Sequence, residues 1–322
     1  MEDKDLVLLK DVKKYYPVRW GVLMREVATV KAVDGVTLAI KEGETLGLVG
    51  ESGCGKSTLG RLILRLEEAS AGEIYFEGEN ISHLAREPLK HLRRKMQIIF
   101  QDPYSSLNPK MKVSRIIGEP FVIHDVLPKE EREKKISRLM EVVGLSPDYM
   151  NLYPSQLSGG QRQRIGIARA LALNPRLIVA DEPISSLDVS IQAQIINLLQ
   201  QLQKEFGLTY LFISHDLRVV EHISDRVAVM YLGKIVELAD GEVIYQNPIH
   251  PYSEALLSSI PIPDPTLTRE ERFLHGDVPS PINPPPGCRF HTRCFLKEEI
   301  CVKEEPRLSP RKNGSLVACH VR

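Results

Sequence analysis

The chain has 322 residues, of which 42 are Lys or Arg and 42 are Asp or Glu, so its formal net charge is zero. It is 43% hydrophobic and 26% charged, which fits a globular protein with one large domain and additions, or with two domains. It has no apolar run of the roughly 18 residues needed to cross a membrane, no signal-peptide pattern in its acidic first residues, and no basic excess for nucleic acid. Secreted, membrane-spanning and disordered proteins are therefore excluded, and the balanced charge disfavours a dedicated nucleic-acid binder.

Short apolar runs alternate with longer amphipathic stretches, which predicts an α/β fold. A buried strand is expected over 44–50, ending in a glycine turn. A helix is expected over 56–66, with an apolar face formed by Leu59, Leu62, Ile63 and Leu66. Two further buried strands are expected over 177–180 and 208–214. The helix between them, over 191–206, is stopped by Gly207.

The middle and the end of the chain have a different texture. The middle is charged and helical in pattern, and its predicted helix over 128–145 presents Ile136, Leu139, Met140 and Val143 on one side. Eight prolines fall between Ile260 and Cys288, which predicts an extended connector. We therefore expect a domain over 1–245, with a helical subdomain inserted at about 82–165, and a C-terminal extension over 246–322.

A phosphate-binding loop is predicted at Gly50–Ser57. Its sequence GESGCGKS fits G-x-x-x-x-G-K-[ST] at every fixed position, with a predicted strand before it and a predicted helix after it. Glycines let backbone N–H groups converge on an anion, and the following helix presents its positive end. Lys56 would reach the β- and γ-phosphates, and the Ser57 hydroxyl would join the shell of a Mg²⁺ ion.

Two acidic residues follow the predicted strand over 177–180. Asp181 can hold the Mg²⁺ shell, and Glu182 can polarise an attacking water. Acidic residues often end strands for no catalytic reason, so this signal is weak alone. It acquires weight only because the phosphate loop is present.

The segment Leu157–Gln161, LSGGQ, identifies a family when taken with the phosphate loop and Asp181–Glu182. Together they resemble the nucleotide-binding subunits of ABC transporters, in which LSGGQ is the signature motif. The family's other marks follow in order: Gln101 matches the Q-loop glutamine, Ser186–Asp188 the D-loop, and His215 the switch histidine. Tyr16, or otherwise Tyr15, stands where the family stacks an aromatic ring on adenine.

This resemblance implies a P-loop ABC ATPase fold: a RecA-like α/β subdomain with an antiparallel β edge, a helical insertion and a cysteine-bearing C-terminal extension. It implies ATP and Mg²⁺ as ligands, Glu182 as the general base, and His215 and Gln101 as its catalytic partners. Mg²⁺ is assigned to Ser57, Gln101 and Asp181. The residues assigned to the nucleotide are Tyr16, Gly50, Ser52, Gly53, Cys54, Gly55, Lys56, Ser57, Thr58, Gln101, Asp181, Ser158, Gly159, Gly160, Gln161 and Asp188.

The signature turn predicts a dimer. A Ser-Gly-Gly turn that opens a helix is a second anion site, and one chain has no reason to aim two such sites at one nucleotide. In the family, two subunits meet head to tail, and the signature of each closes on the ATP of the other. We therefore expect a second ABC ATPase subunit, either a copy of this chain or a paralogue, with Ser158 and Gly160 acting on the partner's ATP.

Longer stretches resemble the oligopeptide/dipeptide importers in particular: 101–109 (QDPYSSLNP), 188–194, 250–252 and 279–294. This implies an ATPase at the cytoplasmic face of the membrane that powers peptide import through two integral-membrane permease subunits and an extracytoplasmic solute-binding protein. The segment 104–120 would receive a permease helix. The alternatives are an importer of nickel or another small solute, and a soluble ABC ATPase without a membrane partner, which the single phosphate loop disfavours.

Four cysteines, Cys288, Cys294, Cys301 and Cys319, crowd the end of the chain. In an intracellular protein such a group more often binds a metal than forms disulfides. The close C-x2-C pairs typical of zinc are missing. The family resemblance implies a 4Fe–4S cluster on these four residues; zinc, with His291 or His320 as added ligands, and no metal remain as alternatives.

Overall fold

The computed structural model describes residues 4–21, 25–259, 274 and 276–322. The chain divides into two compact units, one made of 1–41, 45–82 and 214–322, and the other of 42–44 and 83–213. Part of the predicted proline-rich connector lies outside the described residues, namely 260–273 and 275. The division into 1–245 and 246–322 stays a prediction.

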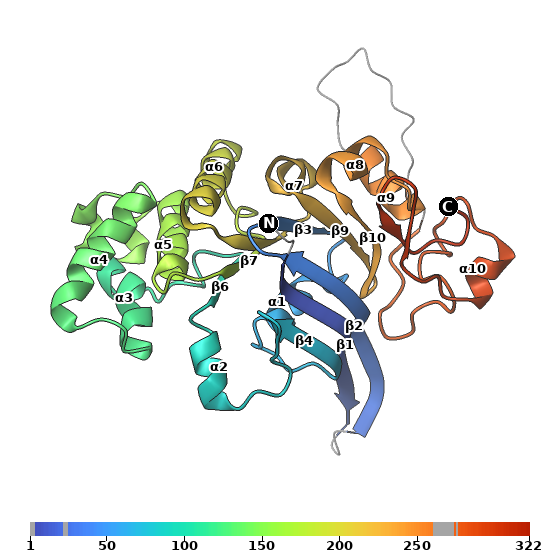
Figure 1. The fold of residues 1–322 in the computed structure, drawn as a ribbon, viewed down its shortest axis with the longest axis horizontal. Coiled ribbons are helices and arrows are strands. Elements are labelled where there is room, and N and C mark those ends of the chain that lie inside the picture. The colour runs from blue at the N-terminus through green and yellow to red at the C-terminus, as the bar shows by residue number, and fades with distance from the viewer. Residues whose placement is uncertain (1–3, 22–24, 260–273, 275) are drawn as a thin grey trace, which may run out of the picture. The chain divides into compact units, whose positions relative to one another are not determined.

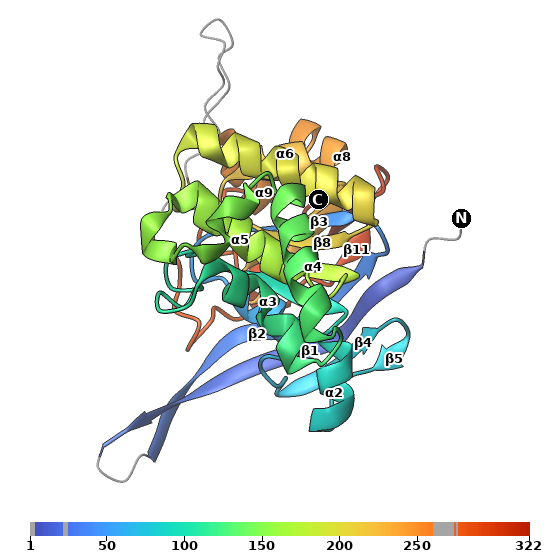
Figure 2. The ribbon, with the colours of Figure 1, turned by 90° about the vertical axis from the view of Figure 1, so that its left-hand side faces the viewer.

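The first unit contains an antiparallel sheet in the order β2-β1-β4-β5. Figures 1 and 2 show β1 and β2 as two long neighbouring strands. Their register places Leu9 opposite Leu38, and both side chains are buried. This sheet is the antiparallel β edge that the family resemblance implies. Its strands are β1 (Asp5–Trp20), β2 (Arg25–Lys41), β4 (Ala71–Phe76) and β5 (Glu79–Asn80).

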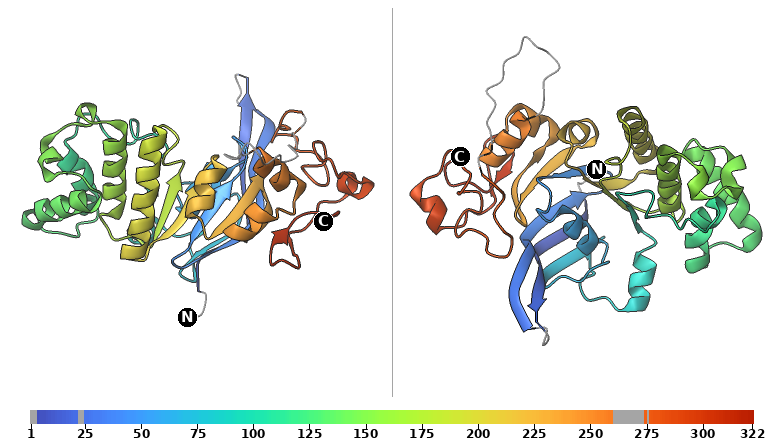
Figure 3. Two further views of the ribbon diagram at one scale, coloured as in Figure 1. Left: turned by 90° about the horizontal axis from the view of Figure 1, so that it is seen from above. Right: turned by 180° about the vertical axis from the view of Figure 1, so that it is seen from behind.

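The rest of the first unit is built on strands in the order β11-β12-β10-β9-β3. The fully buried β3 (Thr45–Val49) runs parallel to β9 (Arg226–Tyr231), which pairs antiparallel with β10 (Lys234–Asp240). The C-terminal extension adds β12 (Leu316–Val317) beside β10, and β11 (Ser309–Pro310) beyond it. The helices are α1 (Lys56–Ile63), α7 (Leu217–Ile223), α8 (Gly241–Gln246), α9 (Pro251–Ser258) and α10 (Glu299–Lys303). Both views of Figure 3 show the red C-terminal residues beside the orange segment of α8 and α9.

The second unit has three parallel strands in the order β8-β7-β6. Its central strand β7 is buried at every residue, as a strand covered on both faces must be. The strands are β6 (Met96–Ile99), β7 (Leu177–Asp181) and β8 (Thr209–Ile213). The helices are α2 (Arg86–Leu92), α3 (Val113–Ile123), α4 (Lys129–Val142), α5 (Gly159–Leu171) and α6 (Val189–Phe206), with short 3-10 turns η1 (Pro147–Asn151) and η2 (Pro154–Gln156).

The predicted strands over 44–50, 177–180 and 208–214 are confirmed, and so are the helices over 128–145 and 191–206. The predicted apolar side of α4 is buried, from Ile136 to Val143. The helix expected over 56–66 ends three residues early, at Ile63, because Arg65 adopts a left-handed conformation with φ of 51°. Leu66, expected on the buried face, is therefore 47% exposed. Within the described ranges, no helix is both long and apolar enough to cross a membrane.

Candidate nucleotide-binding site

The phosphate loop joins β3 to α1 through three glycines with positive φ: Gly50, Gly53 and Gly55. A Cβ atom on Gly50 would lie 2.2 Å from the carbonyl oxygen of Met230, and one on Gly55 would lie 2.1 Å from that of Ala32. Only glycine fits either position, both for its backbone conformation and for the close approach. The loop backbone therefore packs directly against the backbone of its own unit at Met230 and Ala32.

The start of α1 is suited to bind phosphate. Its N-cap residue is Gly55, which offers no side chain to satisfy the first N–H groups of the helix. Lys56 is buried, and its ammonium donates to the carbonyl oxygens of Gly50 at 2.7 Å and Glu51 at 3.1 Å. A loop with an uncapped helix end and a lysine folded over it fits the triphosphate of ATP.

Tyr15 and Tyr16 both lie in the first unit, and each hydroxyl already has a partner. The Tyr16 hydroxyl donates to Glu67, and the Tyr15 hydroxyl donates to Asp34. Burial is the larger cause and these hydrogen bonds the next; together they raise the pKa of each phenol to about 12. Both phenols therefore stay neutral, and the choice of Tyr16 for adenine stays a prediction.

Asp181 and Glu182 lie where β7 ends, and a side chain from just beyond the end of β6 reaches Glu182. Asp181 is the buried last residue of the strand, and Glu182 then turns out with a left-handed φ of 47°. The backbone N–H of Glu182 donates to the Ile213 carbonyl at 2.9 Å, which fixes the turn on β8. Gln101, 81 positions away, donates from Nε2 to Oε2 of Glu182 at 2.8 Å. Two residues predicted separately thus meet in one site.

The signature turn is a self-capped helix start. Ser158 caps α5 by accepting the Gln161 N–H at 3.3 Å, and the Gln161 side chain accepts the Ser158 N–H at 2.9 Å. The glycines between them allow the D-loop and the first turn of α6 to pack closely. A Cβ on Gly159 would lie 3.3 Å from the Leu187 side chain, and one on Gly160 would lie 2.7 Å from that of Ile191. The signature and the D-loop therefore form one packed surface.

The predicted site residues fall into two groups. The first unit holds residues 50–58, Tyr16 and the exposed His215; the second holds Gln101, Asp181, Glu182, residues 158–161 and Asp188. Each group is assembled within its own unit. The roles assigned to them, including the Mg²⁺ ligands, stay predictions.

The predicted 4Fe–4S cluster is wrong. Among the residues that the structure describes, no three His, Cys, Asp or Glu side chains are grouped so that they could hold a metal ion, and the zinc alternative fails for the same reason. Cys288, Cys294, Cys301 and Cys319 are free cysteines, and burial raises the thiol pKa of Cys288 to about 11. Their crowding at the end of the chain and the family resemblance suggested ligands, but the described residues are not arranged as a ligand set.

Apolar packing and hydrogen bonds secure the extension instead. Phe290 is 1% exposed, and its ring centroid lies 5.3 Å from those of both Tyr231 and Tyr252. The N–H of Ala318 donates to the Val236 carbonyl at 2.8 Å beside the pairing of β12 with β10. This small segment is thus anchored by an aromatic cluster and a strand.

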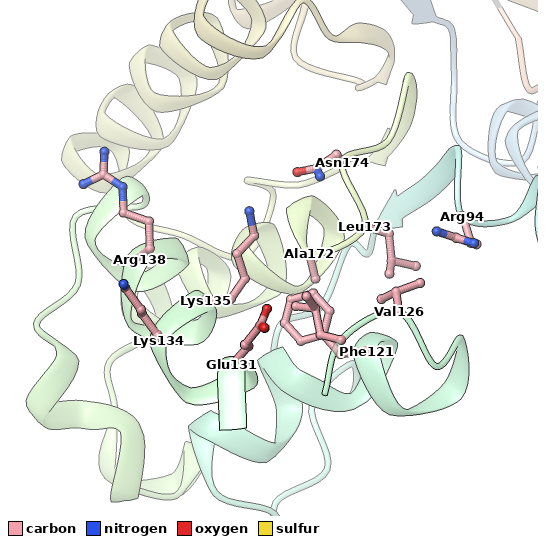
Figure 4. Close-up of a pocket in the computed structure, with 11 residues that line it drawn as sticks. Arg94, Phe121, Val126, Glu131, Lys134, Lys135, Arg138, Ala172, Leu173 and Asn174 are labelled. Atoms are coloured by element: carbon pink, nitrogen blue, oxygen red, sulfur yellow. The ribbon is translucent and has the colours of Figure 1, made fainter. Parts of the chain in front are cut away.

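A cavity of about 740 Å³ lies in the second unit, among α3, α4 and the end of α5 (Figure 4). Its lining combines apolar Phe121 and Leu173 with the basic side chains of Lys134, Lys135 and Arg138. None of the residues predicted for the nucleotide lines it. The cavity is therefore separate from the phosphate chemistry.

Sequence reasoning missed two residues that contact the phosphate loop from the C-terminal extension. Tyr252 and Arg293 both bond to Glu51, which lies about 200 or more positions earlier in the chain. No periodicity or spacing links residues so distant. Their only signal was membership in the stretches that resemble the importers.

Comparison with known proteins identifies the class. Residues 33–185 match the ABC transporter family model, and residues 236–301 match the model of the oligopeptide/dipeptide transporter C-terminal region. A dimeric post-hydrolysis ATP-binding cassette bound to ADP and Pi is similar, with a TM-score of 0.65, 33% identity, and coverage of 73% of this chain and 98% of that one. The chain is an ABC ATPase, as the fold and the phosphate loop indicate.

The subfamily follows from full-length relatives. The chain is 55% identical over 316 residues to the oligopeptide transport ATP-binding protein AppF of Bacillus subtilis, covering 97% of this chain and 96% of the relative. It is 50% identical over 309 residues to the dipeptide transport ATP-binding protein DppF of Escherichia coli, covering 96% and 92%. The chain belongs to the family of oligopeptide/dipeptide ABC transporter ATP-binding proteins.

Proposed function

We propose that this chain is the ATP-hydrolysing subunit that powers the import of dipeptides and oligopeptides. One observation carries the proposal: an uncapped, glycine-built phosphate loop occurs in the same chain as a match over 236–301 to the peptide-transporter C-terminal region. The two full-length relatives compared above are named for the transport of oligopeptides and of dipeptides, which favours peptides over nickel as the solute.

Within this proposal, the chain's own side chains have distinct tasks. Lys56 exchanges its contacts with the carbonyls of Gly50 and Glu51 for the ATP phosphates. Glu182 accepts the proton of the attacking water. Gln101 orients the Glu182 carboxylate through the 2.8 Å hydrogen bond between the two side chains. His215 donates a hydrogen bond to the γ-phosphate. Mg²⁺, held by Ser57, Asp181 and Gln101, would neutralise charge on the phosphates.

We assign Ser158 and Gly160 to the ATP of a second subunit. The support is the helix start at α5, whose remaining N–H groups and dipole suit an anion, and the dimeric state of the similar cassette structure. Because Leu187 of the D-loop packs on Gly159 and Ile191 of α6 packs on Gly160, movement of the signature turn would carry Asp188 with it.

The permease contact is assigned to the segment 104–120. Tyr104 is 62% exposed, and Val122 just beyond the segment is 60% exposed. Two arginines of helix α5 contact this segment. The guanidinium carbon of Arg162 lies 3.9 Å from the Tyr104 ring centroid, and Arg169 donates a hydrogen bond to the Ser106 carbonyl at 2.8 Å. Because α5 begins at the signature, a displacement of this segment by the permease would also displace Ser158 and Gly160, which are assigned to the partner's ATP.

The remaining assignments concern the assembly. The chain would work at the cytoplasmic face of the membrane with two permease subunits, which receive peptide from an extracytoplasmic solute-binding protein. The test is to reconstitute the chain with its co-purified permeases and binding protein in liposomes, and to measure ATP-dependent uptake of labelled dipeptides to pentapeptides and of nickel. Uptake of peptides but not nickel is expected; uptake of nickel alone would overturn the proposed solute.

A further inference from the structure

Glu51 stands out in the phosphate loop because it places a negative charge in a segment that must receive the negative phosphates of ATP. Its carboxylate is paired by Arg293 of the C-terminal extension. The two guanidinium nitrogens of Arg293 donate to the two carboxylate oxygens of Glu51 at 2.6 and 3.1 Å. The Arg293 side chain is 5% exposed and that of Glu51 is 25% exposed. The pair is bidentate and largely withdrawn from water, which is the strong form of this interaction.

The backbone of the same residue is held by the extension as well. The N–H of Glu51 donates to the hydroxyl of Tyr252 at 2.9 Å. Tyr252 is fully buried, and its ring lies 4.7 Å from that of Tyr231 and 5.3 Å from that of Phe290, centroid to centroid. Phe290 precedes Arg293 by three residues, so one aromatic cluster supports both contacts with Glu51.

A third contact reaches the loop through the turn between β9 and β10. The N–H of Gly233 in this turn donates to the Cys54 carbonyl of the phosphate loop at 2.8 Å. Arg289 donates to the carbonyl of Leu232, the preceding residue, and pairs with Asp34. The extension therefore braces the loop on two sides, with Arg293 and Tyr252 at Glu51 and Arg289 behind Cys54.

We propose that Arg293 is a positioning residue of the ATP site: by pairing with Glu51, it cancels the negative charge inside the phosphate loop and fixes the loop for the triphosphate. The inference rests on the proposed binding of ATP at this loop. It assigns to the C-terminal extension a role in setting ATP affinity, in addition to any role in assembly.

The expected size of the effect follows from Coulomb's law. An uncompensated carboxylate about 8 to 10 Å from a phosphate, at an effective dielectric of about 30 to 60 in this partly exposed loop, lowers affinity about three- to tenfold. Removing the Glu51 carboxylate instead should change ATP affinity in the opposite direction. A Glu51→Gln chain keeps the Arg293 cation without its counter-charge, so ATP affinity should be equal or higher.

The test measures the Kd of a fluorescent ATP analogue, together with KM and kcat, for Arg293→Gln, Glu51→Gln and the double variant in the full chain. Arg293→Gln should weaken binding about three- to tenfold and raise KM by the same factor, with little change in kcat. The double variant should return to within about twofold of wild type, because neither charge is left alone. If Arg293 only supported the packing of the extension, adding Glu51→Gln would not restore the ATP affinity that Arg293→Gln loses.

Two controls separate the possible outcomes. Arg322→Gln removes a comparable ion pair of the extension, with Glu254 at 2.7 Å, and should leave the Kd unchanged. Lys56→Ala should weaken binding about 10- to 100-fold; if it does not, the phosphate-loop assignment itself fails. If Lys56→Ala weakens binding in this way, three results overturn the role of Arg293: wild-type affinity in Arg293→Gln, equal weakening in Arg322→Gln, or a double variant as weak as Arg293→Gln.

Discussion

The phosphate loop before α1 and the signature turn before α5 both place glycines at the start of a helix, but they satisfy the helix differently. At α1 the N-cap is Gly55, no side chain caps the helix, and the loop glycines have positive φ. At α5 Ser158 and Gln161 form a capping box, and the glycines lie inside the helix. The first turn leaves its N–H groups to a ligand, whereas the second partly satisfies its own.

The glycines also serve different neighbours. Those of the phosphate loop make room for backbone carbonyls, Met230 for Gly50 and Ala32 for Gly55, and so fix the shape of the cradle. Those of the signature make room for two side chains, Leu187 of the D-loop for Gly159 and Ile191 of α6 for Gly160, and so join the signature to the D-loop and to α6. Under the proposed function, the first turn binds ATP within its own unit, and the second meets the ATP of another subunit.

The largest effect that separates the two turns is expected for Ser158→Arg. A bulky cation at the signature should block its approach to the partner's ATP and lower steady-state hydrolysis at least about 100-fold, the scale of losing one preorganised donor. ATP binding to the chain's own loop should be unchanged. Phosphate release and equilibrium nucleotide binding check both parts, and a matching loss of binding would refute the division of roles.

A second effect concerns the shape of the cradle. Gly55→Ala places a Cβ 2.1 Å from the Ala32 carbonyl at a φ of 110°, so we expect a loss of about 2–4 kcal/mol in the free energy of unfolding. The matched control is Gly166→Ala in the interior of α5, where the added Cβ meets nothing within 4 Å and should stabilise by up to about 1 kcal/mol. Urea denaturation measures both; equal stability of the two variants would contradict the account.

A third, smaller effect tests the ligand of the uncapped helix. Lys56→Ala removes the ammonium that lies over the loop, so ATP affinity should fall about 10- to 100-fold, as expected for charge-assisted hydrogen bonds. Isothermal titration with ATP and Mg²⁺ gives the value. An unchanged Kd would mean that the nucleotide binds elsewhere in the chain.

The smallest effect tests the self-capping of α5. Ser158→Ala removes the cap to the Gln161 N–H and should cost about 1 kcal/mol of stability. Ser155→Ala, at an exposed serine in the preceding 3-10 turn, should change stability by no more than about 0.5 kcal/mol. Thermal melting without nucleotide compares the two, and identical curves would show that the capping box contributes nothing.

The sequence predicted what local pattern determines. The phosphate loop, the strands before Gly50 and Asp181, and the apolar side of α4 all follow from spacing within one element, and the structure contains them. The end of α1 was misplaced because a single left-handed residue, Arg65, stops the helix while the apolar spacing continues to Leu66. Backbone conformation at one residue is not visible in a hydrophobic period.

Contacts between distant residues could not be predicted in this way. The Gln101 and Glu182 side chains meet only because β6 and β7 are neighbours in the sheet. The Arg293–Glu51 pair depends on how the extension folds back on its unit. The metal prediction for the four cysteines was wrong because closeness along the chain and resemblance to a family do not determine how side chains are grouped in the fold.

We propose that ATP hydrolysis directed by Glu182 powers peptide import. The most direct measurement compares wild type and Glu182→Gln in vesicles that contain the assembled transporter, with ATP binding, phosphate release and labelled-peptide uptake followed together. We expect binding to be retained, while hydrolysis and uptake fall together at least about 100-fold. Hydrolysis at the wild-type rate, or uptake that continues without hydrolysis, would contradict the account.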